Sequence, residues 1–170
     1  MDTLNKILLF ILVLILSVFF FSIYLSSSIN NNLVDARELA VEVTIGDEVG
    51  INLDMDPMNF GTVMPRGRSK RNLIYNTTTG GYLFMTLEGN ISNHLFYERN
   101  YQPFLTEGVN YVPLMAYGNG GEHGVYDGVL TIYFFKKEPN FFQKLYLGSE
   151  LPSATEDLQG SRVSLTVPEQ

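Results

Sequence analysis

The sequence feature that most constrains this chain is an apolar segment over residues 7–25, which has no charged residue and in which Ser17 and Ser22 are the polar interruptions. As a helix it would extend roughly 28 Å, close to the hydrocarbon thickness of a lipid bilayer, which is about 30 Å. A helix buried in a protein core is usually shorter and mixed with polar positions. We therefore predict a transmembrane helix over residues 7–25, with the lipid bilayer as its partner.

A cleaved signal peptide is the alternative interpretation of this segment, because the small residues Ser26, Ser27 and Ser28 follow it. The apolar segment is longer than the roughly 7 to 15 residues of a signal-peptide core, and Lys6 is the only basic side chain before it. We therefore favour an uncleaved signal anchor, with residues 1–6 as a short cytoplasmic N-terminus.

The flanking charges predict the orientation of the helix only weakly, since one basic residue, Lys6, precedes the apolar segment and another, Arg37, follows it. Two N-glycosylation sequons lie further on, at Asn76 and Asn90, each at a predicted turn. A large domain that follows a first membrane helix is also the usual layout of an exported, tethered domain. We therefore predict a single-pass protein of the cell membrane with an extracytoplasmic C-terminal domain.

The composition of the chain limits what this domain can be. Of its 170 residues, 45% are hydrophobic and 13% are aromatic, which suffices for a packed core. The formal net charge of -7 argues against nucleic acid as a partner. The absence of cysteine excludes disulfides, thiolate zinc sites and thiol nucleophiles.

Alternating apolar and polar side chains, typical of strands with one buried face, fill residues 39–137. The runs 39–45 and 49–53 are separated by Gly46 and Asp47 and predict a hairpin. A polar spacer over residues 26–38 is expected to separate this domain from the lipid. Further strands are predicted over residues 59–63, 69–75, 82–88, 94–98, 109–117 and 125–135.

About eight strands without a long helical pattern between them predict an all-β domain. Their spacing favours an immunoglobulin-like antiparallel β-sandwich, preceded by one N-terminal transmembrane helix. In the last strand, residues 126 to 134 present alternate side chains to one face, while Tyr133 and Phe135 lie on the opposite face. We therefore expect another element to cover Tyr133 and Phe135.

Three stretches carry a resemblance to known proteins: MNFGTVMPRGRSKRNLIYN at 58–76, GYLFMTLEGN at 81–90 and GVYDGVLTIYFF at 124–135. Together they resemble small membrane-anchored immunoglobulin-like sandwich domains of prokaryotic, especially archaeal, cell-surface proteins. The resemblance covers roughly residues 55–137 and implies an architecture without catalytic residues. The cysteine and tryptophan residues that mark antibody-type domains are absent.

The C-terminal tail, residues 138–170, predicts two further elements. Residues 138–148 predict a short amphipathic helix between Pro139 and Gly148. Its apolar stripe either covers Tyr133 or Phe135, which we favour, or lies at the lipid surface. That stripe consists of Phe141, Phe142, Leu145 and Tyr146.

The second element of the tail is a strand predicted from the alternation over residues 163–167. Such a strand could extend its own sheet, or it could pair with a neighbouring subunit and drive self-assembly. We favour the first arrangement or disorder.

A short basic cluster, formed by Arg66, Arg68, Lys70 and Arg71, interrupts this acidic chain. We interpret it as solvated charge at a sheet edge, where lysine and arginine discourage aggregation. The functional alternative is a patch that binds an anionic partner such as a glycan, a cell-wall polymer or lipid headgroups.

Candidates for chemistry are few. His94 and His123 are far apart in the sequence, and a metal set of Glu122, His123 and Asp127 has no spacing that enforces it. Asp54 and Asp56 lack the other ligands of a calcium loop, and the glycine-rich loop at 118–124 misses the dinucleotide fingerprint. We therefore predict no enzyme, no metal and no cofactor.

These expectations favour a membrane-anchored extracytoplasmic sandwich that acts as a structural, adhesive or assembly module of the cell surface. The alternative is an accessory subunit of a membrane protein complex that is recruited through its transmembrane helix.

Overall fold

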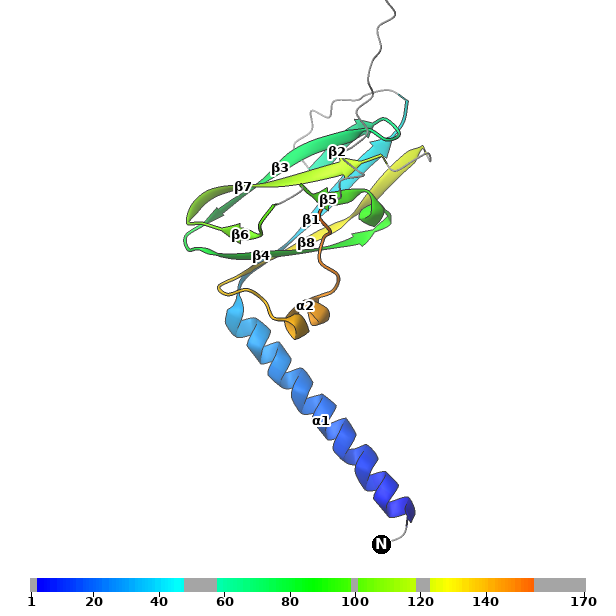
Figure 1. Ribbon diagram of the computed structural model, residues 1–170, viewed down its shortest axis with the longest axis vertical. Helices are drawn as coiled ribbons and strands as arrows, with labels where there is room; N and C mark the ends of the chain where they lie inside the picture. The colour runs from blue at the N-terminus through cyan, green and yellow to red at the C-terminus, as the bar shows by residue number, and fades with distance from the viewer. Residues whose placement is uncertain (1–2, 48–57, 99–100, 119–122, 155–170) are drawn as a thin grey trace, which may run out of the picture.

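The computed structural model describes residues 3–47, 58–98, 101–118 and 123–154. A long helix, α1 (Thr3–Asn32), leads into a body of β-strands, and a short helix, α2 (Phe141–Leu147), follows the last strand (Figure 1). The described residues therefore form a mostly β protein with one N-terminal apolar helix, as predicted. We call residues 33–135 the sheet domain.

The strands form two sheets, one of five strands in the order β2-β1-β8-β4-β6 and one of three strands in the order β3-β7-β5. The six strands predicted after residue 58 are confirmed to within one or two residues at each end. β6 and the 3-10 helix η1 (Asn90–Asn93) were not predicted from the sequence. The strands are β1 (Leu33–Ile45), β2 (Met58–Val63), β3 (Arg68–Thr77), β4 (Gly81–Gly89), β5 (Leu95–Tyr97), β6 (Phe104–Leu105), β7 (Gly108–Tyr117) and β8 (Gly124–Phe135).

The expectation of a purely antiparallel fold is wrong at one pair of strands. β2 runs parallel to β1, with Met58 beside Val41 and Val63 beside Ile45. On its other side β1 pairs antiparallel with β8 along nearly its whole length, and β8 pairs antiparallel with β4. The second half of the predicted hairpin, residues 49–53, lies outside the described residues.

The main hydrophobic core lies between the two sheets, because its buried side chains come from strands of both. The alternation read from the sequence is confirmed in β1, where Val41, Val43 and Ile45 are buried. Further core side chains are Phe60, Tyr75, Leu83, Met85, Leu95, Leu105, Val112, Leu114, Leu130, Ile132 and Phe134.

Close approach of β8 to the end of β4 depends on one glycine. Gly128 pairs with Gly89, and a Cβ atom at Gly128 would overlap the carbonyl oxygen of Glu88 and lie 2.7 Å from the Cγ2 atom of Ile91. No side chain fits at this crossing without a shift of backbone. Glycine is therefore required at position 128 for steric reasons.

The chain after α2 closes the open side of the two sheets. The backbone amide of Leu151 donates to the carbonyl of Met85 in β4, and Tyr97 in β5 exchanges backbone hydrogen bonds with Pro152 and Ala154. Leu151 and Ala154 are buried as a result. The strand predicted over residues 163–167 lies outside the described residues, so self-assembly through it stays a prediction.

The polar spacer predicted over residues 26–38 is wrong as a description of the structure. α1 continues to Asn32 and β1 begins at Leu33, so no irregular segment separates the helix from the sheets. Residues 26–32 continue the helix because it places Leu25 and Ile29, four residues apart, on one side. Both side chains are buried against the sheet domain, and this packing stabilises the last turns although the residues between them are polar. The long helix and the sheet domain are thus directly joined.

Candidate functional site

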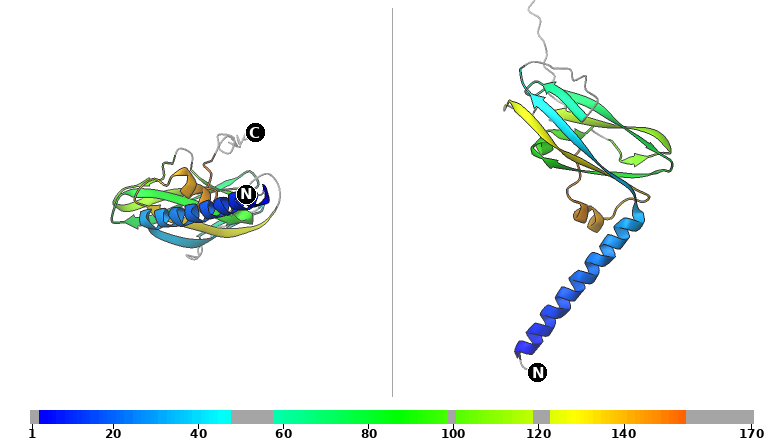
Figure 2. Two further views of the ribbon diagram at one scale, coloured as in Figure 1. Left: turned by 90° about the horizontal axis from the view of Figure 1, so that it is seen from below. Right: turned by 180° about the vertical axis from the view of Figure 1, so that it is seen from behind.

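The junction between α1, α2 and the sheet domain combines a small hydrophobic cluster with several side-chain hydrogen bonds. α1 and α2 lie at the same end of the sheet domain, and three views agree on this arrangement (Figure 1, Figure 2). Among the described residues, α1 is the one helix long and apolar enough to cross a membrane, and no residue in its most apolar window is buried. A signal sequence near the N-terminus can also meet this criterion of length and composition, so the contacts at the junction bear on the choice between the two.

A second, smaller hydrophobic cluster attaches α1 to the outer face of the five-stranded sheet. Leu25 and Ile29 of α1 pack with Phe84 of β4 and Phe135 of β8, all of which are buried. Phe135 was expected to need a cover, and α1 supplies it. Leu147 of α2 contributes from the side, together with other half-buried apolar residues, namely Leu33, Tyr82 and Tyr133.

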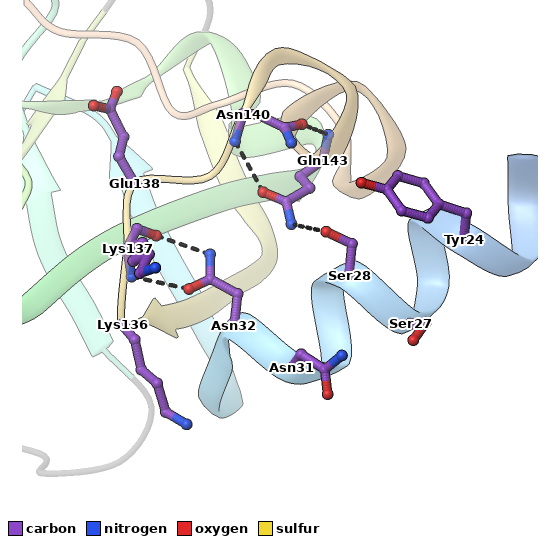
Figure 3. Close-up of a pocket in the computed structure, with 10 residues that line it drawn as sticks. All are labelled: Tyr24, Ser27, Ser28, Asn31, Asn32, Lys136, Lys137, Glu138, Asn140 and Gln143. Carbon is purple, nitrogen blue, oxygen red and sulfur yellow. Dashed lines mark hydrogen bonds between the residues drawn. The ribbon is translucent and has the colours of Figure 1, made fainter.

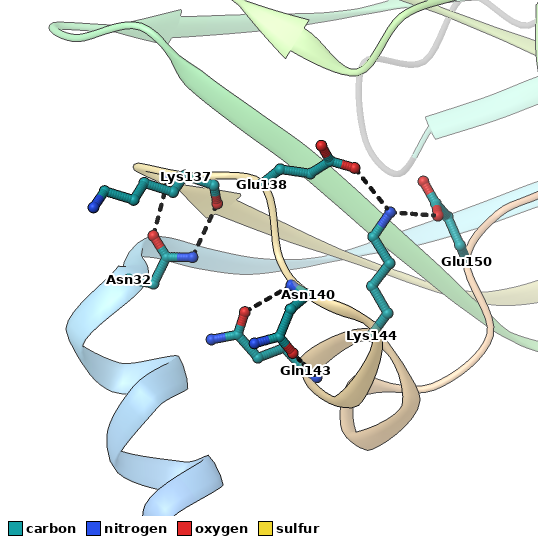
Figure 4. Close-up of polar contacts among 7 residues, drawn as sticks. All are labelled: Asn32, Lys137, Glu138, Asn140, Gln143, Lys144 and Glu150. Carbon is teal, nitrogen blue, oxygen red and sulfur yellow. Dashed lines mark hydrogen bonds and ion pairs between the residues drawn. The ribbon is translucent and has the colours of Figure 1, made fainter.

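Asn32, the last residue of α1, binds the chain that leaves β8. Its side-chain amide donates to the carbonyl of Lys137 at 2.9 Å, and its side-chain oxygen accepts from the Lys137 amide at 2.9 Å (Figure 4). The backbone amide of Lys136 donates to the Asn32 carbonyl at 3.0 Å. These three bonds, which we call the Asn32 clasp, satisfy backbone groups that a helix end and a strand end would otherwise leave without partners.

α2 is fixed by a reciprocal cap and by one bond to α1. The Asn140 side chain accepts from the Gln143 amide, and the Gln143 side chain accepts from the Asn140 amide, which is a capping box. The Gln143 side-chain nitrogen then donates to the Ser28 hydroxyl at 3.1 Å (Figure 3). Gln143 is buried, so the polar side of α2 faces α1 and the sheet domain.

Between these bonds lies an open pocket of about 660 Å³. Hydroxyl, amide and lysine side chains line it, and Figure 3 draws them. Together with the carboxylate of Glu138, such groups can bind polar molecules through hydrogen bonds. The lining residues are Tyr24, Ser27, Ser28, Asn31, Asn32, Lys136, Lys137, Glu138, Asn140 and Gln143.

The apolar side of α2 faces away from the sheet domain, which overturns the expectation that it covers Tyr133 or Phe135. Phe141 is 72% exposed and Leu145 is 69% exposed, and Phe142 and Tyr146 are more than half exposed. The reason is that α1 already covers the outer face of β8, and Gln143 takes the buried side of α2. The ring of Phe142 contacts Phe21 of α1, with the ring centroids 5.5 Å apart, and the neighbouring ring of Phe141 at 5.6 Å.

Two strands from different sheets are joined near the junction by a small polar cluster. The Tyr75 hydroxyl donates to Asp35 at 2.9 Å, and Arg37 pairs with the same carboxylate oxygen at 2.7 Å. Burial alone would raise the pKa of Asp35, but these hydrogen bonds from Tyr75 and Arg37 outweigh it and lower that pKa. Burial, and then the bond to Asp35, raise the pKa of Tyr75 to about 12.

The predicted basic cluster is spread over more than one surface. Arg66 lies in the turn between β2 and β3, with a left-handed backbone φ of 64°. Arg68 and Lys70 are exposed on one face of β3, and Lys70 pairs with Glu98 at 2.7 Å. Arg71 is half-buried on the alternate face of the strand. Binding of an anionic partner by these residues stays a prediction.

The asparagines of the two glycosylation sequons are exposed residues. Asn76 is in β3 and not at the predicted turn, while Asn90 begins η1. The Asn90 side-chain oxygen accepts from the Asp127 amide at 2.6 Å. Both side chains belong to exposed residues, and modification of either stays a prediction.

The histidines occupy separate places. His94 is buried, and its Nδ1 lies 3.0 Å from the Tyr117 carbonyl, to which it donates. Its ring is tilted by 46° against the ring of Tyr126, with the centroids 4.1 Å apart. His123 is exposed beside Asp47 at 3.1 Å. Within the described residues no three metal-binding side chains gather, and Glu122, Asp54, Asp56 and part of the glycine-rich loop lie outside them.

A second pocket, of about 320 Å³, lies where the tail crosses the sheets. The rings of Tyr97 and Tyr101 stack there with centroids 5.3 Å apart, close to Glu150. Burial raises the pKa of Tyr101 to about 12 and that of Tyr97 further, so both phenols stay protonated at neutral pH. Neither phenol is therefore an activated nucleophile.

Comparison with protein-family models, with curated proteins and with solved structures gave no match. The function is therefore inferred from the geometry of the chain itself. Sequence reasoning predicted α2 but missed its junction with α1, and a further local signal for α2 was present. Asn140 and Gln143 have the spacing of a capping box, which marks the start of α2.

Proposed function

We propose that this chain is a single-pass membrane-anchored protein whose sheet domain stands in the extracytoplasmic space as a structural, adhesive or assembly module of the cell surface. The observation that carries this proposal is the junction, where an apolar helix with an unburied outer surface is joined to the sheets without a spacer. A tether of this kind holds the domain close to the lipid and limits its tilt. Such restraint suits a module that presents a surface or joins an assembly.

Retention of α1 in the mature protein is part of this proposal, and the same junction supports it. Cleavage after any of the residues Ser26 to Ser28 would remove Leu25 and detach its contacts with Phe84 and Phe135. Cleavage would also leave only the last few residues of α1 before Asn32, so the Asn32 clasp would hold a short helical remnant. Loss of Leu25 would uncover part of Phe84 and Phe135, although Ile29 would stay beside them. Full burial of such a ring contributes about 1.5 to 3 kcal/mol, so the partial exposure is unfavourable. The packing supports an anchor rather than a disposable signal peptide.

Within this proposal, the sheet domain is immunoglobulin-like and related to the membrane-anchored sandwich domains of prokaryotic, archaeal-type cell surfaces. Support comes from two sheets that share one core and from the antiparallel contacts of β8 with β1 and β4. The parallel pairing of β1 with β2 is a departure from the purely antiparallel arrangement.

Protease digestion of intact cells tests the sidedness. We expect a tag at the C-terminus to be removed by external protease, while a tag at the N-terminus survives until the membrane is broken. Both tags should remain in the membrane fraction after alkaline carbonate extraction. A C-terminal tag that survives on intact cells would place the sheet domain in the cytoplasm and contradict the proposal.

The second candidate, an accessory subunit recruited through its transmembrane helix, is favoured by one observation. The Asn32 clasp and the packed Leu25 fix how α1 is rotated relative to the sheets, so a partner helix would also orient the sheet domain. Replacing residues 7–20 with an unrelated apolar helix leaves this junction intact. Loss of co-purifying membrane proteins in that variant would support this candidate, and unchanged co-purification would exclude it.

A further inference from the structure

We propose that α2 is a second membrane contact, whose apolar side enters the interfacial layer of the bilayer beside α1 and sets the orientation of the sheet domain. This inference rests on the proposed function, because it requires α1 to span the membrane. The exposed side of α2 consists of Phe141, Phe142, Leu145 and Tyr146. Three aromatic rings and one leucine on one side of a seven-residue helix form a patch that water solvates poorly.

The position of α2 along α1 indicates the depth of this patch. The apolar segment of α1 ends at Leu25, and Phe21, the contact of Phe142, lies four residues earlier, or about 6 Å along the helix. Interfacial helices bury their apolar side about 5 to 10 Å into the boundary of headgroups and acyl chains. If Leu25 marks that boundary, Phe142 therefore lies at the depth expected for an interfacial helix.

The polar side of α2 lies further from the membrane centre than its apolar side, at the depth expected for lipid headgroups. Gln143 is bonded to Ser28, which lies three residues beyond Leu25, or about 4.5 Å further from the membrane centre. Lys144 extends toward the sheet domain, where its Nζ atom lies 3.5 Å from Glu138 and 3.7 Å from Glu150 (Figure 4). The polar side chains thus stay in the headgroup layer while the apolar ones point into lipid.

Lipid is the occupant that this geometry fits, because the apolar side of α2 is continuous with the apolar surface of α1 through the ring contact between Phe21 and Phe142. Tyr146 offers an aromatic body and a polar hydroxyl, as do the tyrosines of membrane-interface belts. Lys136 and Lys137 line the neighbouring pocket, beside the last turns of α1, and supply positive charge that would favour lipid phosphates. A partner protein or a second copy on this side of α2 is the competing outcome of the test below.

The chain has no tryptophan, so a single introduced tryptophan reports its own depth. The full-length protein is reconstituted in phospholipid vesicles, and its emission is quenched by lipids brominated at different depths of the acyl chain. Three variants are compared: Phe142→Trp in α2, Phe10→Trp within the apolar segment of α1, and Val125→Trp, an exposed position at the start of β8. Val125 is the water-exposed control, because it lies at the end of β8 opposite to Phe135 and therefore away from α1.

We expect quenching of the tryptophan at 142 by shallow bromines, quenching of the one at 10 by deep bromines, and none at 125. If 142 behaves like 125 while 10 is quenched, the inference on α2 is wrong and the membrane anchor stands. If 10 is not quenched either, the proposed function fails as well. Protection of 142 from both bromolipid and aqueous iodide would show that protein covers α2, which also overturns the inference. Phe141→Trp repeats the measurement at a second exposed ring.

Discussion

The ring of Phe21 in α1 stands nearly perpendicular to the ring of Phe142 in α2, at an interplanar angle of 81° and a centroid separation of 5.5 Å. The two residues are more than a hundred positions apart in the chain, and each is about half exposed. Their contact brings the beginning of α2 to the outer end of the apolar segment of α1. Through this contact the exposed apolar side of α2 is continuous with the apolar surface of α1.

Replacing Phe142 with glutamate is expected to release α2 from the lipid, because a carboxylate is costly in the acyl boundary. The chain has no cysteine, so a spin label at Leu145→Cys reports on α2 alone. Its accessibility to an aqueous nickel complex should rise and its accessibility to oxygen should fall. Phe142→Leu, which keeps the apolar character, should leave both accessibilities unchanged. Equal accessibilities in the glutamate variant would contradict the lipid contact.

Removal of the two side-chain bonds of the Asn32 clasp is expected to widen the range of angles between α1 and the sheet domain. Asn32→Ala loses both side-chain bonds to Lys137, each worth about 0.5 to 1.5 kcal/mol. Spin labels at Leu14→Cys and Val125→Cys should then give a broader distribution of distances in reconstituted protein. Asn31→Ala, at the exposed neighbouring position, is the matched control. A distribution as narrow as that of the parent chain would mean that the apolar cluster alone holds the angle.

Gly128→Ala is expected to destabilise the sheet domain by about 1 to 3 kcal/mol, since the added methyl group overlaps the Glu88 carbonyl and Ile91. Gly124→Ala is the control in the same strand, because the nearest atom to its Cβ would be 3.7 Å away, an ordinary contact. Thermal unfolding followed by circular dichroism measures both variants. Equal midpoints for the two would show that β4 and β8 are not as close as described.

Stability is expected to fall above pH 10. The pKa of Tyr75 is raised to about 12 in the folded chain, whereas an unfolded tyrosine titrates near pH 10. The contribution of Tyr75 is therefore complete below pH 10 and is lost as the pH rises to 12. Tyr75→Phe removes this proton, so denaturant unfolding of that variant should depend less steeply on pH between 10 and 12. An unchanged slope would mean that Tyr75 does not hold its proton more tightly in the folded chain.

The strand pattern could be predicted well from the sequence because each strand has one face in a single core. Val41, Val43 and Ile45 alternate with polar residues, and burial follows that alternation. Pairing was less predictable: β1 and β2 lie parallel, which local alternation does not specify, since the same face is buried in either direction.

The junction could not be predicted for a different reason. The stripe on α2 was expected to cover Phe135, because aromatic residues are usually buried. Leu25 and Ile29 take that place, and they were assigned to a membrane segment and a polar spacer. Periodicity shows that a helix has an apolar side and does not show whether protein or lipid covers it.

Retention of α1 is the central claim, and identification of the N-terminus of the protein in native membranes tests it most directly. Mass spectrometry of the intact protein from the membrane fraction should give a chain that still contains residues 3–32. A chain that begins near Ser26 to Ser28, released from the membrane by carbonate, would show that the segment is a cleaved signal peptide. It would contradict both the anchor and the role of α2 beside it.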